Sequence, residues 1–126
     1  MRTNAGADFQ ARVMADTSST GTGSYAAANW IGVTANATAP GAGDTTLTGE
    51  ISSGTLNRAQ AVYAHTNGTT TYTLTKTFTS DQSITLAKIG VFNASSAGTM
   101  VFETLLNATA VMVSGDQITV TETVSM

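Results

Sequence analysis

The chain has 126 residues, a formal net charge of −3 and only 10% charged residues, against roughly 25% in an average soluble domain. That length suits one domain with an ordinary core, and the low, negative charge argues against binding to nucleic acid or to an anionic membrane surface. The absence of cysteine excludes disulfides and thiolate chemistry, and no apolar run approaches the ~20 residues of a bilayer span.

The N-terminal third predicts an arm followed by two strands and two long loops. Residues 1–14 are interpreted as an extended N-terminal arm or first strand, and no apolar segment in them resembles a signal peptide, so we expect synthesis in a cytoplasm. Residues 29–35 and 45–51 are predicted to be strands. The loops at 15–28 and 36–44 are rich in small residues, and we expect them to be poorly ordered unless something binds over them.

Residues 57–79 predict a hairpin. Asn67-Gly68 lies between two β-prone runs, which is typical of a type I′ turn and would place Tyr63 opposite Tyr72. Threonines alternate through the second run and make up 25 residues of the whole chain. Threonine suits the exposed face of a sheet, because its β-branched side chain is stiff there at little cost. We therefore expect a neutral, hydrogen-bonding sheet surface.

A second hairpin is predicted in residues 88–106, with the turn in "NASSAG". Its strands are apolar on both faces, so both faces must be covered, either by another sheet or by a neighbouring subunit. The C-terminal residues 117–126 alternate apolar and polar side chains, with Glu122 as the exception, and predict a half-buried strand paired within a sheet.

Together these signals predict eight or nine short strands and no amphipathic helix. The fold class is all-β, an antiparallel β-sandwich for which a jelly roll is one possible form, with an extended N-terminal arm. Residues 15–126 would form the single sandwich domain.

The ionisable residues show no pattern that points to catalysis. His65, the only histidine, lies beside the predicted turn, and no G-x-S-x-G element is present. Most carboxylates stand singly at turn starts, where aspartate binds backbone N–H groups. Glu103 and Glu122 interrupt apolar strands, which suits either a protected strand edge or an ion pair with Lys76 or Lys88 at a subunit contact.

No catalytic residue, cofactor site or metal site is therefore predicted; the D-x-D-x-D spacing of a calcium loop is absent from the sequence. Trp30 is interpreted as a core or interface anchor in preference to a sugar-stacking platform, because Ile31 and Val33 continue its strand. The residues that we expect at an interface with other proteins are Arg2, Phe9, Arg12, Trp30, Ile89, Phe92, Phe102 and Glu103.

Several segments in order resemble a family of small virion proteins of tailed bacteriophages. They are "TNAGADFQARVM", "NWIGVTANATAPGAGDTTLTGE", "KIGVFNASSAGTMVFETLL" and "SGDQITVTETVSM", and they span most of the chain. In that family an "aGLFnaasGGtm" hairpin is followed by closing strands that begin at "aGD". The resemblance implies a structural protein of the head or of the tail.

From the resemblance and the neutral β-surface we expect a capsid decoration protein, located on the capsid surface of the virion. Its partners would be the major capsid protein and further copies of itself in a homotrimer, with no nucleic acid and no membrane. The alternative is a tail-fibre or baseplate protein that contacts the host surface. An enzyme such as a fibre-borne depolymerase, or a carbohydrate-binding module centred on Trp30, is the less favoured interpretation.

Overall fold

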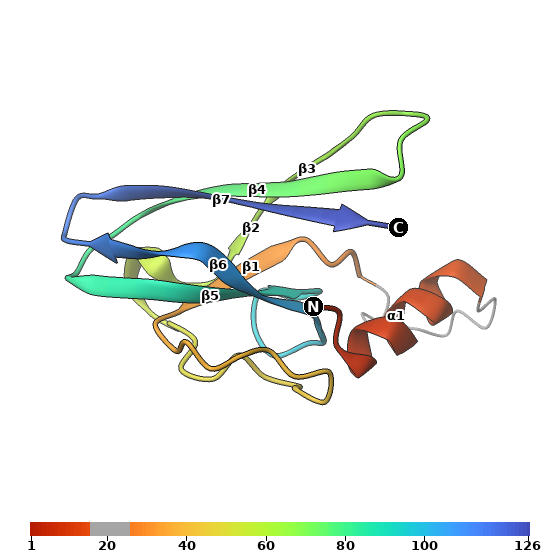
Figure 1. Ribbon diagram of the computed structural model, residues 1–126, viewed down its shortest axis with the longest axis horizontal. Helices are drawn as coiled ribbons and strands as arrows, with labels where there is room; N and C mark the ends of the chain where they lie inside the picture. Colours follow the sequence, from red (N-terminus) through yellow and green to blue (C-terminus); the bar gives the residue numbers. More distant parts are fainter. Residues whose placement is uncertain (16–25) are drawn as a thin grey trace.

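The computed structural model describes residues 1–15 and 26–126, and it consists of two antiparallel sheets packed face to face (Figure 1). The first sheet has the strand order β2-β1-β5-β6 and the second has the order β3-β4-β7. The strands are β1 (Trp30–Thr34), β2 (Ala59–Gln60), β3 (Val62–His65), β4 (Thr71–Thr79), β5 (Ile84–Phe92), β6 (Met100–Met112) and β7 (Gln117–Ser125). The antiparallel sandwich is confirmed, whereas the jelly roll is not.

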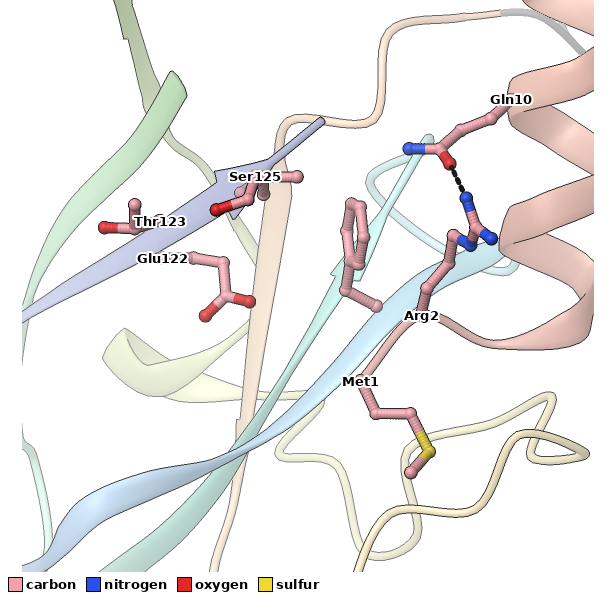
Figure 2. A pocket seen from close by; sticks show the side chains of 8 residues that line it. Met1, Arg2, Gln10, Glu122, Thr123 and Ser125 are labelled. Atoms are coloured by element: carbon pink, nitrogen blue, oxygen red, sulfur yellow. Dashed lines mark hydrogen bonds between the residues drawn. The ribbon is translucent and has the colours of Figure 1, made fainter. Parts of the chain in front are cut away.

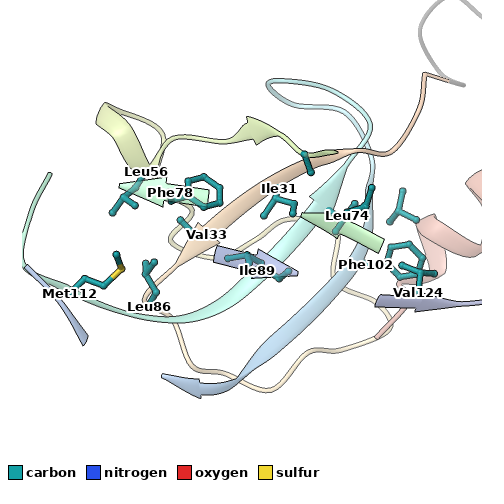
Figure 3. Close-up of a cluster of buried hydrophobic side chains, with 14 residues drawn as sticks. Ile31, Val33, Leu56, Leu74, Phe78, Leu86, Ile89, Phe102, Met112 and Val124 are labelled. Carbon is teal, nitrogen blue, oxygen red and sulfur yellow. The ribbon is translucent and has the colours of Figure 1, made fainter. Parts of the chain in front are cut away.

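The hydrophobic core fills the space between the sheets (Figure 3). Ile31, Ile89 and Phe102 enter it from the first sheet, and Leu74 and Phe78 enter it from the second. Period-two alternation explains this arrangement, because every second side chain of a strand points to the same face. Most of the loop prediction at 15–28 lies outside the described residues.

The outer face of the four-stranded sheet is covered by the chain's own loop, residues 35–58, which runs below β5 and β6 in Figure 1. Leu47 of this loop packs on Phe92 and Met100 in a second apolar cluster. The expectation of a second sheet or a subunit over this face is therefore wrong. The strand predicted at 45–51 is wrong as well; these residues are loop, and the short 3-10 helix Gly54–Leu56 follows them.

Glycine allows the loop to lie close to this face. Gly32 of β1 and Gly90 of β5 are directly opposite each other in the register. A Cβ on Gly32 would overlap the carboxylate of Glu50 in the loop, and one on Gly90 would press on Phe92 and Met100. Gly32 thus leaves room for Glu50 of the loop, and Gly90 leaves room for Phe92 and Met100, on which Leu47 of the loop packs.

The extended N-terminal arm is wrong, because residues Asn4–Ala15 form the helix α1 at one end of the sandwich (Figure 1). Thr3 caps it, accepting a hydrogen bond from the N–H of Gly6 at 2.9 Å and donating one to the carbonyl of Met100 at 2.6 Å. Asp8 and Arg12 form an i,i+4 ion pair on its exposed side. Phe9 packs against the core, so the helix belongs to the sandwich domain.

The residues before the helix do behave as a short strand. The amide of Thr3 donates to the carbonyl of Val101, and the amide of Glu103 donates to the carbonyl of Met1. These bonds cover the first part of the outer edge of β6.

The hairpin around Asn67-Gly68 is present, but its register differs from the prediction by two residues. Tyr72 is opposite His65, and Tyr63 is opposite Leu74. Of the two turn residues Asn67 and Gly68, only Gly68 has a positive φ. A type I′ turn requires a positive φ at both residues, so the turn is not of this type. A shift by two keeps every side chain on its face, and the two tyrosine rings still meet diagonally with centroids 5.6 Å apart.

We predict that Gly6→Ala loosens α1 from the sandwich. A Cβ at Gly6 would overlap the backbone carbonyl of Val101, which cannot move without disturbing β6. The loss should be about 1–3 kcal/mol in the free energy of urea unfolding. Ala11→Val, on the exposed side of the same helix, should change stability by less than about 0.7 kcal/mol. Equal losses in the two variants would contradict the close contact.

Candidate interaction surface

Lys88 and Glu103 form an ion pair that is buried within one chain. Lys88 Nζ lies 2.7 Å from Glu103 Oε1, and both side chains are almost completely removed from solvent, at 2% and 1% exposed. Lys88 Nζ also donates to the carbonyl of Thr38 at 3.0 Å, which ties the covering loop to β5. The predicted pairing of Glu103 with Lys88 is thus present, but it is not a subunit contact.

Arg58 binds the same loop to the β5–β6 turn. Its guanidinium makes two hydrogen bonds of 2.7 Å to the Glu50 carboxylate and two more to the carbonyls of Ala94 and Ala97. It also stacks on the ring of Phe92, 3.4 Å from the centroid. These bonds indicate a structural role for Arg58, because they leave few of its N–H groups free to bind a ligand.

Most of the residues predicted to lie at an interface with other proteins are instead covered within the chain. Ile89, Phe92, Phe102 and Glu103 are buried inside the chain, and Trp30 is half-buried against the cluster of Leu47, so they present little or no surface to a partner. The sequence pattern was apolar on both faces, and it could not distinguish cover by a loop from cover by a subunit. Arg2, Phe9 and Arg12 remain accessible at the surface to differing degrees.

An apolar groove lies between α1 and the nearby end of the sandwich. It has a volume of about 780 Å³, and its lining includes Arg2, Phe9, Val13, Tyr63 and Met126. Val13, Tyr63 and Met126 are large apolar side chains that are more than half exposed. Exposed apolar side chains that gather in one hollow are typical of protein-binding sites. The groove thus contains Arg2 and Phe9 of the predicted interface, together with residues that the sequence analysis did not select.

Two smaller hollows lie along β7. The first, of about 540 Å³, lies between Met1 and Arg2 on one side and the stretch from Glu122 to Ser125 on the other (Figure 2). The second, of about 350 Å³, lies between residues 104–108 of β6 and residues 118–122 of β7. Glu122 lines both hollows and accepts a hydrogen bond of 2.9 Å from the hydroxyl of Thr104.

The other ionisable residues are structural in the described part of the chain. Asp44 accepts from the amide of Gly41, a bond that lowers the pKa of its carboxyl, and Asp116 accepts from the amide of Val113. His65, near the exposed hairpin tip, forms a hydrogen bond of 2.8 Å with the carbonyl of Thr71. In residues 1–15 and 26–126 no three His, Cys, Asp or Glu side chains gather as a metal site would require. The described helices include none long and apolar enough to span a membrane.

Comparison with models of protein families, with curated proteins and with solved structures gives no match to this chain. The resemblance to phage virion proteins stays a prediction. The geometry adds two candidate surfaces for contact with other protein chains, the accessible apolar groove and the edge along β7.

Removing one member of the buried ion pair should lower the free energy of unfolding by much more than removing both members. Lys88→Met would leave the Glu103 carboxylate buried and unpaired, at a cost of about 3–5 kcal/mol. The double variant Lys88→Met/Glu103→Met should recover most of that loss, because it buries no charge. Urea unfolding of the two single variants and the double variant measures this difference. A double variant no more stable than Lys88→Met would contradict the assignment.

Glu122 should make the fold less stable as the pH rises through the acid range. Burial raises the pKa of its carboxyl above the ordinary value of 4.5, so the unfolded chain releases this proton first on raising the pH. The free energy of unfolding of Glu122→Gln should therefore equal that of the wild type at about pH 3 and exceed it at about pH 7. Unfolding curves across this range test it, and an advantage that is independent of pH would contradict the raised pKa.

Proposed function

We propose that this chain is a structural protein of a tailed-bacteriophage particle, and that it decorates the outer surface of the capsid. Its action would be binding alone: the groove beside α1 would take a segment of the major capsid protein, and the bound protein would stabilise the shell. Many weak contacts on one particle reinforce one another, so each need not be tight.

The observation that carries this proposal is that the separate segments of the sequence resemblance meet in one packed unit. Thr3 bonds to Met100, and the amide of Asn4 bonds to the carbonyl of Ala42 in the loop. Lys88 then joins the loop to the hairpin through Thr38 and Glu103. Residues that are distant in sequence thus pack into one unit, as a family motif spread over most of the chain would require.

The surface chemistry also supports a binding role. The outer face of the second sheet is lined with threonines, among them Thr73, Thr75 and Thr77 on the central strand β4. The side chains of these threonines are uncharged, so this face can lie against another protein without the desolvation of many charges. A tail-fibre or baseplate protein would share this property, so that location is the second candidate.

The composition of purified particles tests the proposal. A decoration protein should be present in copies comparable in number to the major capsid protein, whereas a tail protein should be present in few copies. Quantitative mass spectrometry of intact virions measures this ratio. Particles that lack the protein should also lose heat resistance if it stabilises the shell. Absence of the chain from finished particles would overturn both candidates.

Val13→Asp tests the groove itself. A carboxylate in this apolar hollow should abolish binding to shells that lack the protein, measured by co-sedimentation with purified capsids. Val111→Asp is the matched control, because Val111 is also largely exposed but lies on β6 outside the lining of the groove. If both variants bound as the wild type does, the capsid contact would have to lie elsewhere.

A further inference from the structure

The outer edge of β7 is a long strand edge that no described part of the chain covers. β7 pairs with β4 on one side and is the last strand of its sheet on the other. The remaining edges are less suited to pairing. β2 and β3 are short. β6 is partly covered by Met1–Thr3, and its pairing with β5 shifts register between Leu86 and Lys88. Short and irregular edges are common protections against strand addition.

The hydrogen bonds just beyond the two ends of β7 show which of its backbone groups face outward. The amide of Ser80 donates to the carbonyl of Asp116, and the amide of Met126 donates to the carbonyl of Thr70, in the register that joins β4 to β7. Even-numbered residues of β7 therefore bond to β4. Hydrogen-bonded and outward-facing residues alternate along an antiparallel strand. The N–H and C=O groups of the odd-numbered residues, Thr121 among them, point to the open edge.

The side chains of β7 protect this edge at one position only. Residues 117–125 contain no lysine, arginine or proline, and their single charged side chain, Glu122, faces inward, where it accepts a hydrogen bond from Thr104. The threonines lie on the outer face, where threonine already pairs across this sheet: the hydroxyls of Thr77 and Thr119 are 2.9 Å apart. The two hollows along β7 leave inward-facing side chains such as Ile118 only partly covered.

We propose that β7 pairs antiparallel with β7 of a second copy, about a two-fold axis at Thr121. The strand is self-complementary about that residue, as an isologous interface requires. Thr121 is the middle residue of Gln117–Ser125, so this register uses the whole strand. Thr119 then lies opposite Thr123 of the partner subunit, and both three-stranded sheets join into one continuous sheet across the axis.

Glu122 disfavours the adjacent register with the axis one residue further along. With the axis at Thr121, Glu122 lies opposite Val120 of the partner subunit, and the two carboxylates are only diagonal neighbours. Each can keep its own bond from Thr104. An axis at Glu122 would set the two charges directly opposite each other, which is unfavourable in a sheet. The pairing predicts a dimer in place of the trimer expected from the sequence, and it does not depend on the virion role.

A charge exchange at Thr121 tests the axis directly. Sedimentation equilibrium of the wild type should show a species of twice the 12.8 kDa chain. Thr121→Lys and Thr121→Glu should each weaken the dimer about fivefold or more, because like charges meet on the axis. An equimolar mixture of the two variants should restore dimers, since the introduced ammonium of one chain would then lie opposite the introduced carboxylate of the other.

Thr75→Lys is the matched control. Thr75 is the cross-strand neighbour of Thr121 on the same outer face, but it lies on the central strand away from the axis. This variant should dimerise as the wild type does. Thr121→Pro removes an outward N–H without loss of a bond to β4, so it should give folded monomers with an unchanged circular dichroism spectrum. A monomeric or trimeric wild type, or a mixture that fails to restore dimers, would overturn the proposal.

Discussion

Lys88 and Glu103 lie beneath the loop of residues 35–58, where each charge has lost its water and is compensated by the other at 2.7 Å. The pair contributes little net stability by itself, because the desolvation of two charges offsets most of their attraction. What the pair adds is a connection between the sheet and its cover, because Lys88 also donates to the carbonyl of Thr38 in the loop.

The loop of residues 35–58 can cover the first sheet because it approaches the backbone of β1 closely. Gly32 leaves room for Glu50, and Arg58 then holds Glu50 and the β5–β6 turn together. At the other end, Gly6 lets the first turn of α1 lie against the backbone of β6. In each place a side chain would separate two segments that are distant in sequence, so glycine serves packing here more than turn geometry.

The same cover limits which surfaces stay accessible. With the outer face of the first sheet closed, Val13, Tyr63 and Met126 form an accessible apolar cluster in the groove beside α1, and accessible backbone groups lie along β7. Arg2 and Ser125 line both this groove and the adjoining hollow. Under the two proposals, the groove at one end of the molecule binds a segment of the capsid and the edge of the second sheet pairs with a second copy. Binding through distinct surfaces would suit a component of a repeating assembly.

What the sequence by itself determined was the β-class of the fold, the two main hairpins, the C-terminal strand and the isolated, turn-bound aspartates, because alternation and turn chemistry are local signals. The helix was missed although the i,i+4 pair of Asp8 and Arg12 signals it, since the run around Phe9 was interpreted as a strand. Only the tertiary structure decided that a loop buries Phe92 and Glu103 and leaves β7 at an edge. Such cover arises from contacts between segments far apart in the chain, and no local period encodes which segment comes to lie over which face.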